Sequence, residues 1–185
     1  WHYRQPNNRT YMAKKILILS EPFAPPSFLP RITNLCKNLD RNKWTPEIFT
    51  EKIKDVNYTT DLCPVFQMPY YNSNNKIYWA IKWVLHFLFQ YKDFKLQKFI
   101  ENTTNVNDYD LIFCSISNLF PITTAARLSK KYNKPLIIDL RDIDEQWGKH
   151  KYLTHSISKS STINNFIYKQ IERLNIKRRN KALLQ

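Results

Sequence analysis

The chain has 185 residues, of which 43% are hydrophobic and 15% aromatic, and its formal net charge is +14. This length suits one domain with a full core, and the apolar content excludes an intrinsically disordered chain. The single glycine, Gly148, excludes the glycine-rich loops that hold nucleotide phosphates by close backbone approach.

The cysteines and histidines indicate neither a metal site nor a disulfide framework. Cys36, Cys63 and Cys114 are widely separated without CxxC spacing, and the four histidines show no metal-ligand spacing. We therefore expect reduced cysteines in the core of a cytoplasmic protein, no structural metal and no cofactor.

The amino-terminal part of the chain predicts a short extension followed by a strand. Residues 1–11 are polar and unpatterned, so we expect an unstructured extension before a domain that covers residues 12–185. A short apolar run at residues 16–19 predicts a buried strand.

Prolines follow this first strand and predict an extended loop before a helix. The loop begins with Ser20 and Glu21 and includes Pro25. Ser27 is a suitable N-cap, and apolar residues recur at helical spacing from there to Asp40.

The next part of the chain predicts two strands and a long apolar helix. The strands are expected at residues 45–50 and 65–68, and the helix, continuous or broken, at residues 76–101. Its apolar part, residues 77–89, contains Lys82 and His86 and is shorter than the roughly 20 residues that span a bilayer. We prefer packing in the core for this helix, although its tryptophans, Trp79 and Trp83, with nearby lysines also suit a membrane interface.

Residues 108–147 predict a strand, a helix and a second strand. Continuous apolar runs at residues 111–114 and 136–138 are typical of interior, parallel strands that are buried on both faces. Pro121 suits the first turn of the helix between them. A strand, crossover helix and parallel strand form a right-handed unit, in which ligands bind beyond the carboxyl ends of the strands.

Polar residues stand where these two strands end. Ser115 and Ser117 follow the first strand, and the second leads into Asp139, Arg141 and Asp142. From the residue types alone, a salt-bridged cluster that caps the next helix is as good an interpretation as a ligand site. The Arg141 guanidinium suits a carboxylate or phosphate, which it can hold through two parallel hydrogen bonds.

The carboxyl-terminal part of the chain is helical and basic. A helix is predicted from Thr162 to Leu183, and residues 149–185 contain nine lysines and arginines against one acidic residue, Glu172. Such a segment suits nucleic acid, anionic lipid or a phosphorylated substrate about equally.

The predicted elements alternate between strands and helices, which indicates an α/β domain. We expect an open, doubly wound, mostly parallel and Rossmann-like sheet in a three-layer α/β/α arrangement.

Three stretches of the chain carry a resemblance to a known family. They are KKILILSEPFAPPS with its double proline, YDLIFCSISNLFPITTAARLSKKYNKPLIIDLRD, and the terminal helix IERLNIKRRNKALLQ. With them, residues 14–185 resemble the N-terminal domain of GT-B glycosyltransferases, in particular the family 4 type that builds bacterial surface polysaccharides. Ser27-Phe28-Leu29 stands where the family usually has a glycine pair.

The resemblance implies an acceptor-binding half of a GT-B fold, which is expected to be inactive alone. In such enzymes a second, C-terminal domain binds most of the nucleotide-sugar donor, and the sugar passes to a lipid-linked or polysaccharide acceptor. The acceptor would contact Ser20, Glu21, Pro25, Ser115, Ser117, Asp139, Arg141 and Asp142. No catalytic residue can be assigned from this half.

Two further expectations concern partners and location. The cysteine pattern indicates a cytoplasmic protein, and the basic residues between 149 and 181, with Trp79 and Trp83, suit contact with the anionic inner face of the membrane. The alternative is a non-enzymatic basic α/β module that contacts nucleic acid. We do not favour it, because residues 149–185 lack a helix-turn-helix signature and the aromatic platform of single-strand binders.

Overall fold

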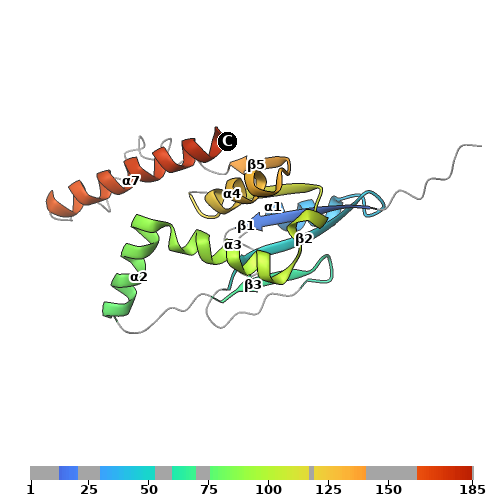
Figure 1. Cartoon of the computed structure of the whole chain (residues 1–185), viewed down its shortest axis with the longest axis horizontal. Helices are drawn as coiled ribbons and strands as arrows, with labels where there is room; N and C mark the ends of the chain where they lie inside the picture. Colours follow the sequence, from blue (N-terminus) through green and yellow to red (C-terminus); the bar gives the residue numbers. More distant parts are fainter. Residues whose placement is uncertain are drawn as a thin grey trace, which may run out of the picture.

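A five-stranded, all-parallel sheet forms the centre of the domain (Figure 1). The computed structural model describes residues 13–20, 30–52, 60–69, 76–116, 119–140 and 162–184. The strands are β1 (Lys14–Ser20), β2 (Trp44–Glu51), β3 (Val65–Met68), β4 (Leu111–Ile116) and β5 (Leu136–Leu140). They follow the order β3-β2-β1-β4-β5 in the sheet, and every neighbouring pair is parallel.

The chain winds outward from β1 in both directions, first through β2 to β3 and then through β4 to β5. The switch point of this doubly wound sheet therefore lies between β1 and β4. Because all strands are parallel, their carboxyl ends share one edge, which we call the carboxyl edge.

Helices cover both faces of the sheet (Figure 1). Residues alternate along β1, so that Leu17 and Leu19 face one core and Ile16 and Ile18 face the other. The helices are α1 (Pro30–Asn38), α2 (Lys76–Phe89), α3 (Tyr91–Thr103), the short 3-10 helix η1 (Val106–Asp108), α4 (Ile122–Tyr132) and α7 (Thr162–Leu183). The first core includes residues of α3, α4 and α7, and the second includes residues of α1.

These layers confirm the Rossmann-like three-layer prediction, and the predicted elements appear in the predicted order. β3 and α7 coincide with the sequence prediction, while β1, β2 and β4 each extend beyond the predicted residues. Pro121 immediately precedes α4, and its carbonyl accepts the N–H of Ala125. The three cysteines are buried free thiols, as expected.

The predicted long helix is broken at Gln90, where the backbone enters the left-handed region with φ 53°. The preference for core packing is wrong for much of the first half, α2. Ile77 is 72% exposed and Ile81 53% exposed, and Val84, Leu88 and Phe89 are exposed as well. The physical reason is the break, because α2 turns away at Gln90 while α3 continues over the sheet (Figure 1).

The prediction that residues 136–138 form an interior strand is also wrong within the part of the chain that the structure describes. β5 is the last strand of that sheet, and Ile137 is 50% exposed. A strand with one neighbour buries less of its surface, although its apolar sequence resembles that of an interior strand. Of the helices described, none is both long enough and apolar enough to cross a bilayer.

Candidate functional site

Three polar residues lie side by side at the carboxyl edge, on adjacent strands. Ser20 of β1 is in register with Ser115 of β4, and Ser115 is in register with Asp139 of β5. Each of them directly follows a buried or partly buried apolar residue of its own strand. The sheet register therefore forms a polar row that crosses the switch point between β1 and β4.

Hydrogen bonds order one end of this row. The Ser115 hydroxyl donates to Asp139 Oδ2 at 2.9 Å, and Ser115 itself is 2% exposed. Asp139 is more open, since its side chain retains 27% of its exposure. The carboxylate can therefore accept a hydrogen bond from a ligand as well as from the protein.

A cationic side chain from helix α1 pairs with the Asp139 end of the row. Arg31, in the first turn of α1, places Nη1 3.2 Å from Asp139 Oδ1. The Arg31 side chain is 62% exposed, so this ion pair contributes only about 0–1 kcal/mol to stability. Both groups are thus available to a charged or hydroxyl-bearing ligand at little energetic cost.

The other end of the row carries an unsatisfied hydroxyl. Ser20 is fully buried, and its Oγ finds no hydrogen-bond partner in the structure. A buried polar group without a partner costs about 1–3 kcal/mol. Because Ser20 is fully buried, a ligand hydroxyl or carbonyl at the carboxyl edge recovers this lost hydrogen bond only if the groups that cover Ser20 move.

Five of the eight residues predicted for the site lie outside the described residues. The structure places Ser20, Ser115 and Asp139 in one row, whereas nothing is described for Glu21, Pro25, Ser117, Arg141 and Asp142. The proposed bidentate role of Arg141 stays a prediction.

Arg31 is a site residue that the sequence prediction missed. The prediction considered the residues that follow each strand and not the first turn of the next helix. A helix that follows a parallel strand begins near the carboxyl edge, so a charged residue in its first turn is the signal that could have identified Arg31.

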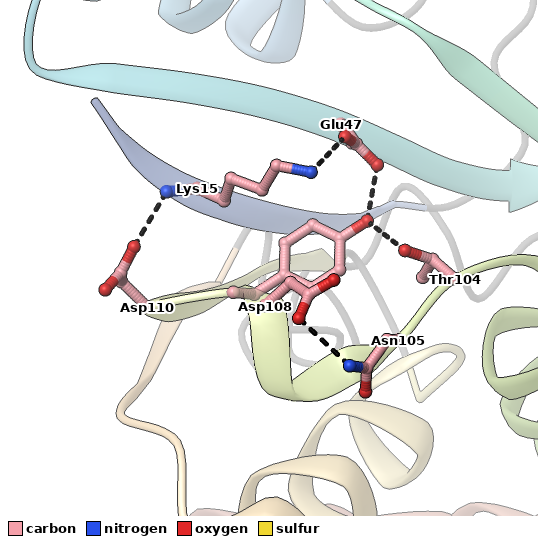
Figure 2. Close-up of polar contacts among 7 residues, drawn as sticks. Lys15, Glu47, Thr104, Asn105, Asp108 and Asp110 are labelled. Atoms are coloured by element: carbon pink, nitrogen blue, oxygen red, sulfur yellow. Dashed lines mark hydrogen bonds and ion pairs between the residues drawn. The ribbon is translucent and has the colours of Figure 1, made fainter. Parts of the chain in front are cut away.

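A second polar cluster lies toward the amino ends of the strands, where its side chains contact one another (Figure 2). The buried Tyr109 hydroxyl donates to Glu47 and shares a hydrogen bond of 3.1 Å with Thr104 Oγ1. Glu47 also pairs with Lys15 at 3.4 Å, and the Lys15 N–H donates to Asp110 at 2.8 Å. Burial, followed by the hydrogen bond with Glu47, raises the pKa of Tyr109 well above its usual range. We assign this cluster a structural role, because its buried groups already satisfy one another.

The chemistry available at the carboxyl edge is hydrogen bonding and charge. Hydroxyl, carboxylate and guanidinium groups can bind a polar, hydroxyl-rich ligand. Among the residues that the structure describes, no cluster of three or more His, Cys, Asp or Glu side chains could hold a metal ion.

Comparisons with protein-family models and with curated proteins found no match for this sequence.

Proposed function

We propose that this domain is the acceptor-binding half of a GT-B glycosyltransferase, which transfers a sugar from a nucleotide-sugar donor to a lipid-linked or polysaccharide acceptor. The observation that carries the proposal is the row of Ser20, Ser115 and Asp139 across the switch point of a Rossmann-like sheet. In open α/β sheets this crevice is the usual ligand site. The resemblance of residues 14–185 to the N-terminal domains of such enzymes supports the same assignment.

The groups of the row match the chemistry of a glycan acceptor. Sugar hydroxyls both donate and accept hydrogen bonds, as serine hydroxyls do, and they donate well to a carboxylate such as Asp139. Arg31, held 3.2 Å from Asp139, can receive an acidic sugar or a phosphate of a lipid-linked acceptor. The resemblance to GT-B enzymes implies that the donor phosphates bind mainly to a second Rossmann-like domain, and the single glycine of this chain is compatible with that arrangement.

A binding experiment on the Ser20 hydroxyl tests this proposal. Ser20→Ala removes a buried hydroxyl that makes no hydrogen bond in the structure, so the folded domain should lose no stability. If the hydroxyl binds acceptor, the variant should bind bacterial surface oligosaccharides about tenfold more weakly in NMR or calorimetric titrations. Asp110→Asn, at an exposed carboxylate far from this edge, is the control.

Three results would contradict the proposal. The first is that the domain binds neither oligosaccharides nor sugar-linked lipid phosphates. The second is that Ser20→Ala and Asp139→Asn bind these ligands as tightly as the unmodified chain does. Tight, steeply salt-dependent binding of random DNA in the same titration would favour the basic nucleic-acid module instead.

We also propose that α2 holds the domain at an anionic membrane surface. Its exposed residues Ile77, Ile81, Val84 and Leu88 recur at helical spacing and form one apolar stripe. The sequence of α2, KIYWAIKWVLHFLF, has two lysines and no acidic residue, and the whole chain carries a charge of +14. An apolar stripe beside positive charge suits an anionic interface. The side chains of Trp79 and Trp83 and residues 149–161 lie outside the described part of the chain.

Vesicle sedimentation tests this second proposal. Replacing Ile77 and Ile81 together by serine should weaken binding to vesicles that contain anionic lipid by tenfold or more, at about 25 cal/mol per Å² of apolar surface lost. Leu184→Ser is the control, because Leu184 is 88% exposed but lies beyond α7. Equal binding to neutral and anionic vesicles, or no effect of the double change, would refute the role of α2.

A further inference from the structure

A cavity of about 350 Å³ lies where the end of α2 meets α4 and α7. Three cationic side chains line it, Arg127 from α4 and Arg178 and Lys181 from α7, and no acidic residue is among its described lining. Clustering of like charges is unfavourable unless a counter-charge is present. The lining therefore favours an anion.

The two guanidinium groups are fixed in place by the protein. Arg127 Nη2 donates to Gln90 Oε1 at 2.6 Å, and its guanidinium lies over the Phe94 ring at 4.0 Å. Arg178 Nη2 donates to the Leu88 carbonyl at 2.9 Å. Side chains held in this way lose little further conformational entropy when a ligand binds.

Two hydrogen-bonding atoms of the cavity residues are unsatisfied. Arg127 Nη1 and Thr123 Oγ1 are buried and have no partner in the structure, and Thr123 as a whole is 9% exposed. A buried donor without an acceptor is costly. Thr123 and Arg127 are four residues apart on α4 and are therefore neighbours on one face of that helix. The several acceptor oxygens of a tetrahedral anion suit two such neighbouring groups.

One buried carboxylate acts on this cluster from outside the described lining. Burial lowers the pKa of Arg178, the charge of Asp93 acts in the opposite direction, and the charge of Arg127 lowers that pKa further. The Asp93 carboxylate already accepts hydrogen bonds from Thr124. Three cations against one carboxylate leave the cluster positively charged.

The remaining wall is apolar and leaves space beyond a single phosphate group. This wall consists of Leu88, Phe89, Ala126 and Ala182. The volume of the whole cavity lies in the range of small-molecule sites, about 300–1,000 Å³. A ligand with an anionic head and a carbon substituent would contact both kinds of wall.

We propose that this cavity is a binding site for a phosphomonoester, with the phosphate at Arg127, Thr123 and Lys181 and its carbon substituent against Leu88 and Ala182. The site is separate from the carboxyl-edge row, because it is built on the helices of the α3 and α4 face, whereas Arg31 belongs to α1 on the other face. It does not depend on the glycosyltransferase proposal.

Calorimetric titration of the whole chain tests this site with two probes at constant ionic strength, namely glycerol 3-phosphate and dihexanoyl phosphatidic acid. Thr123→Val removes only an unpartnered hydroxyl and should not reduce stability. Thr123→Val and Lys181→Gln should each weaken binding of the probes about tenfold, which is the effect of losing one hydrogen bond to a charged group. Lys177→Gln, an exposed lysine of the same helix that does not line the cavity, should bind within about twofold of the unmodified chain.

The two probes distinguish a soluble phosphate ester from a lipid headgroup. Equal affinity would identify a site for soluble phosphomonoesters, and tenfold tighter binding of the lipid would identify a lipid phosphate held by the apolar wall. The proposal is overturned if neither probe binds, if Thr123→Val and Lys181→Gln bind as the unmodified chain does, or if Lys177→Gln weakens binding as much as they do.

Discussion

Asp93 of α3 accepts the backbone N–H of Thr124 at 3.2 Å and so caps the first turn of α4. The Thr124 hydroxyl also lies 3.1 Å from Asp93 Oδ1 and from the Asp93 carbonyl. The two helices that cover one face of the sheet are thereby joined through a carboxyl group that is fully buried. Burial raises the pKa of Asp93 to about 6, even though the bonds from Thr124 favour the charged form.

This pKa predicts a loss of stability as the pH rises. The unfolded chain releases the Asp93 proton near pH 3.9, whereas the folded protein keeps it up to a pH of about 6. The folded state therefore binds more protons between these values, and the free energy of unfolding falls by up to about 3 kcal/mol as the pH passes from about 4 to above 6.

Asp93→Asn tests this prediction, because asparagine keeps an acceptor for Thr124 and does not ionise. The difference in unfolding free energy between the variant and the unmodified chain should shift in favour of the variant by up to about 3 kcal/mol between about pH 4 and pH 7.5. Urea denaturation at both pH values measures it. Asp61→Asn, at an exposed carboxyl, is the control, and an equal pH shift in both variants would count against the assignment.

A largely buried ion pair joins α3 to the end of β2. Lys92 Nζ contacts Glu51 Oε2, and the two side chains retain 16% and 6% of their exposure. Burial raises the pKa of Glu51, although Lys92 acts in the opposite direction. Lys92→Met should therefore cost about 3–5 kcal/mol, because it leaves a buried carboxylate uncompensated.

Replacing both partners should cost much less than replacing one. The double change Glu51→Leu with Lys92→Met removes both charges, and an apolar pair of similar volume is often neutral or stabilising. A double-mutant cycle in urea gives the coupling energy. Additive costs of the two single changes would show that the pair contributes nothing.

Cys36 and Cys63 are placed to form a disulfide under oxidising conditions. Their sulfur atoms lie 3.8 Å apart, and both residues are buried. A disulfide requires an S–S distance of about 2.05 Å, so the two sulfur atoms have to approach by roughly 1.75 Å. Treatment with diamide should give one Cys36–Cys63 disulfide, detected by peptide mass spectrometry, while Cys114 stays a free thiol. A disulfide that includes Cys114 would contradict this prediction.

Asn133 ends α4 in the left-handed region, with φ 50° and ψ 47°. Because Asn133 is exposed, the effect of a substitution on stability depends mainly on whether the new residue tolerates the left-handed backbone conformation. Asn133→Val should lower the free energy of unfolding by about 1–2 kcal/mol, whereas Asn133→Gly should change it by less than about 1 kcal/mol. Thermal unfolding of both variants compares them, and equal losses would contradict this interpretation.

The sequence alone determined the type and order of the elements. Buried strands such as residues 16–19 are short continuous apolar runs, whereas apolar residues recur at helical spacing in the helices that follow. The local sequence pattern is therefore enough to identify both kinds of element. The same information located Ser20, Ser115 and Asp139 at strand ends. Because a parallel sheet brings such ends to one edge, residues that are remote in the chain can be grouped from strand positions alone.

Only the tertiary structure decided the contacts between distant segments. The pair of Arg31 and Asp139 joins residues 108 positions apart, and the bond of Asp93 to Thr124 joins two helices. The exposure of α2 depended on the break at Gln90, and the edge position of β5 depended on which strands pair. The cavity between α2, α4 and α7 likewise required the packing of three helices. Hydrophobic periodicity shows that a face will be buried, but which element covers it is set by the free energy of the whole packed chain.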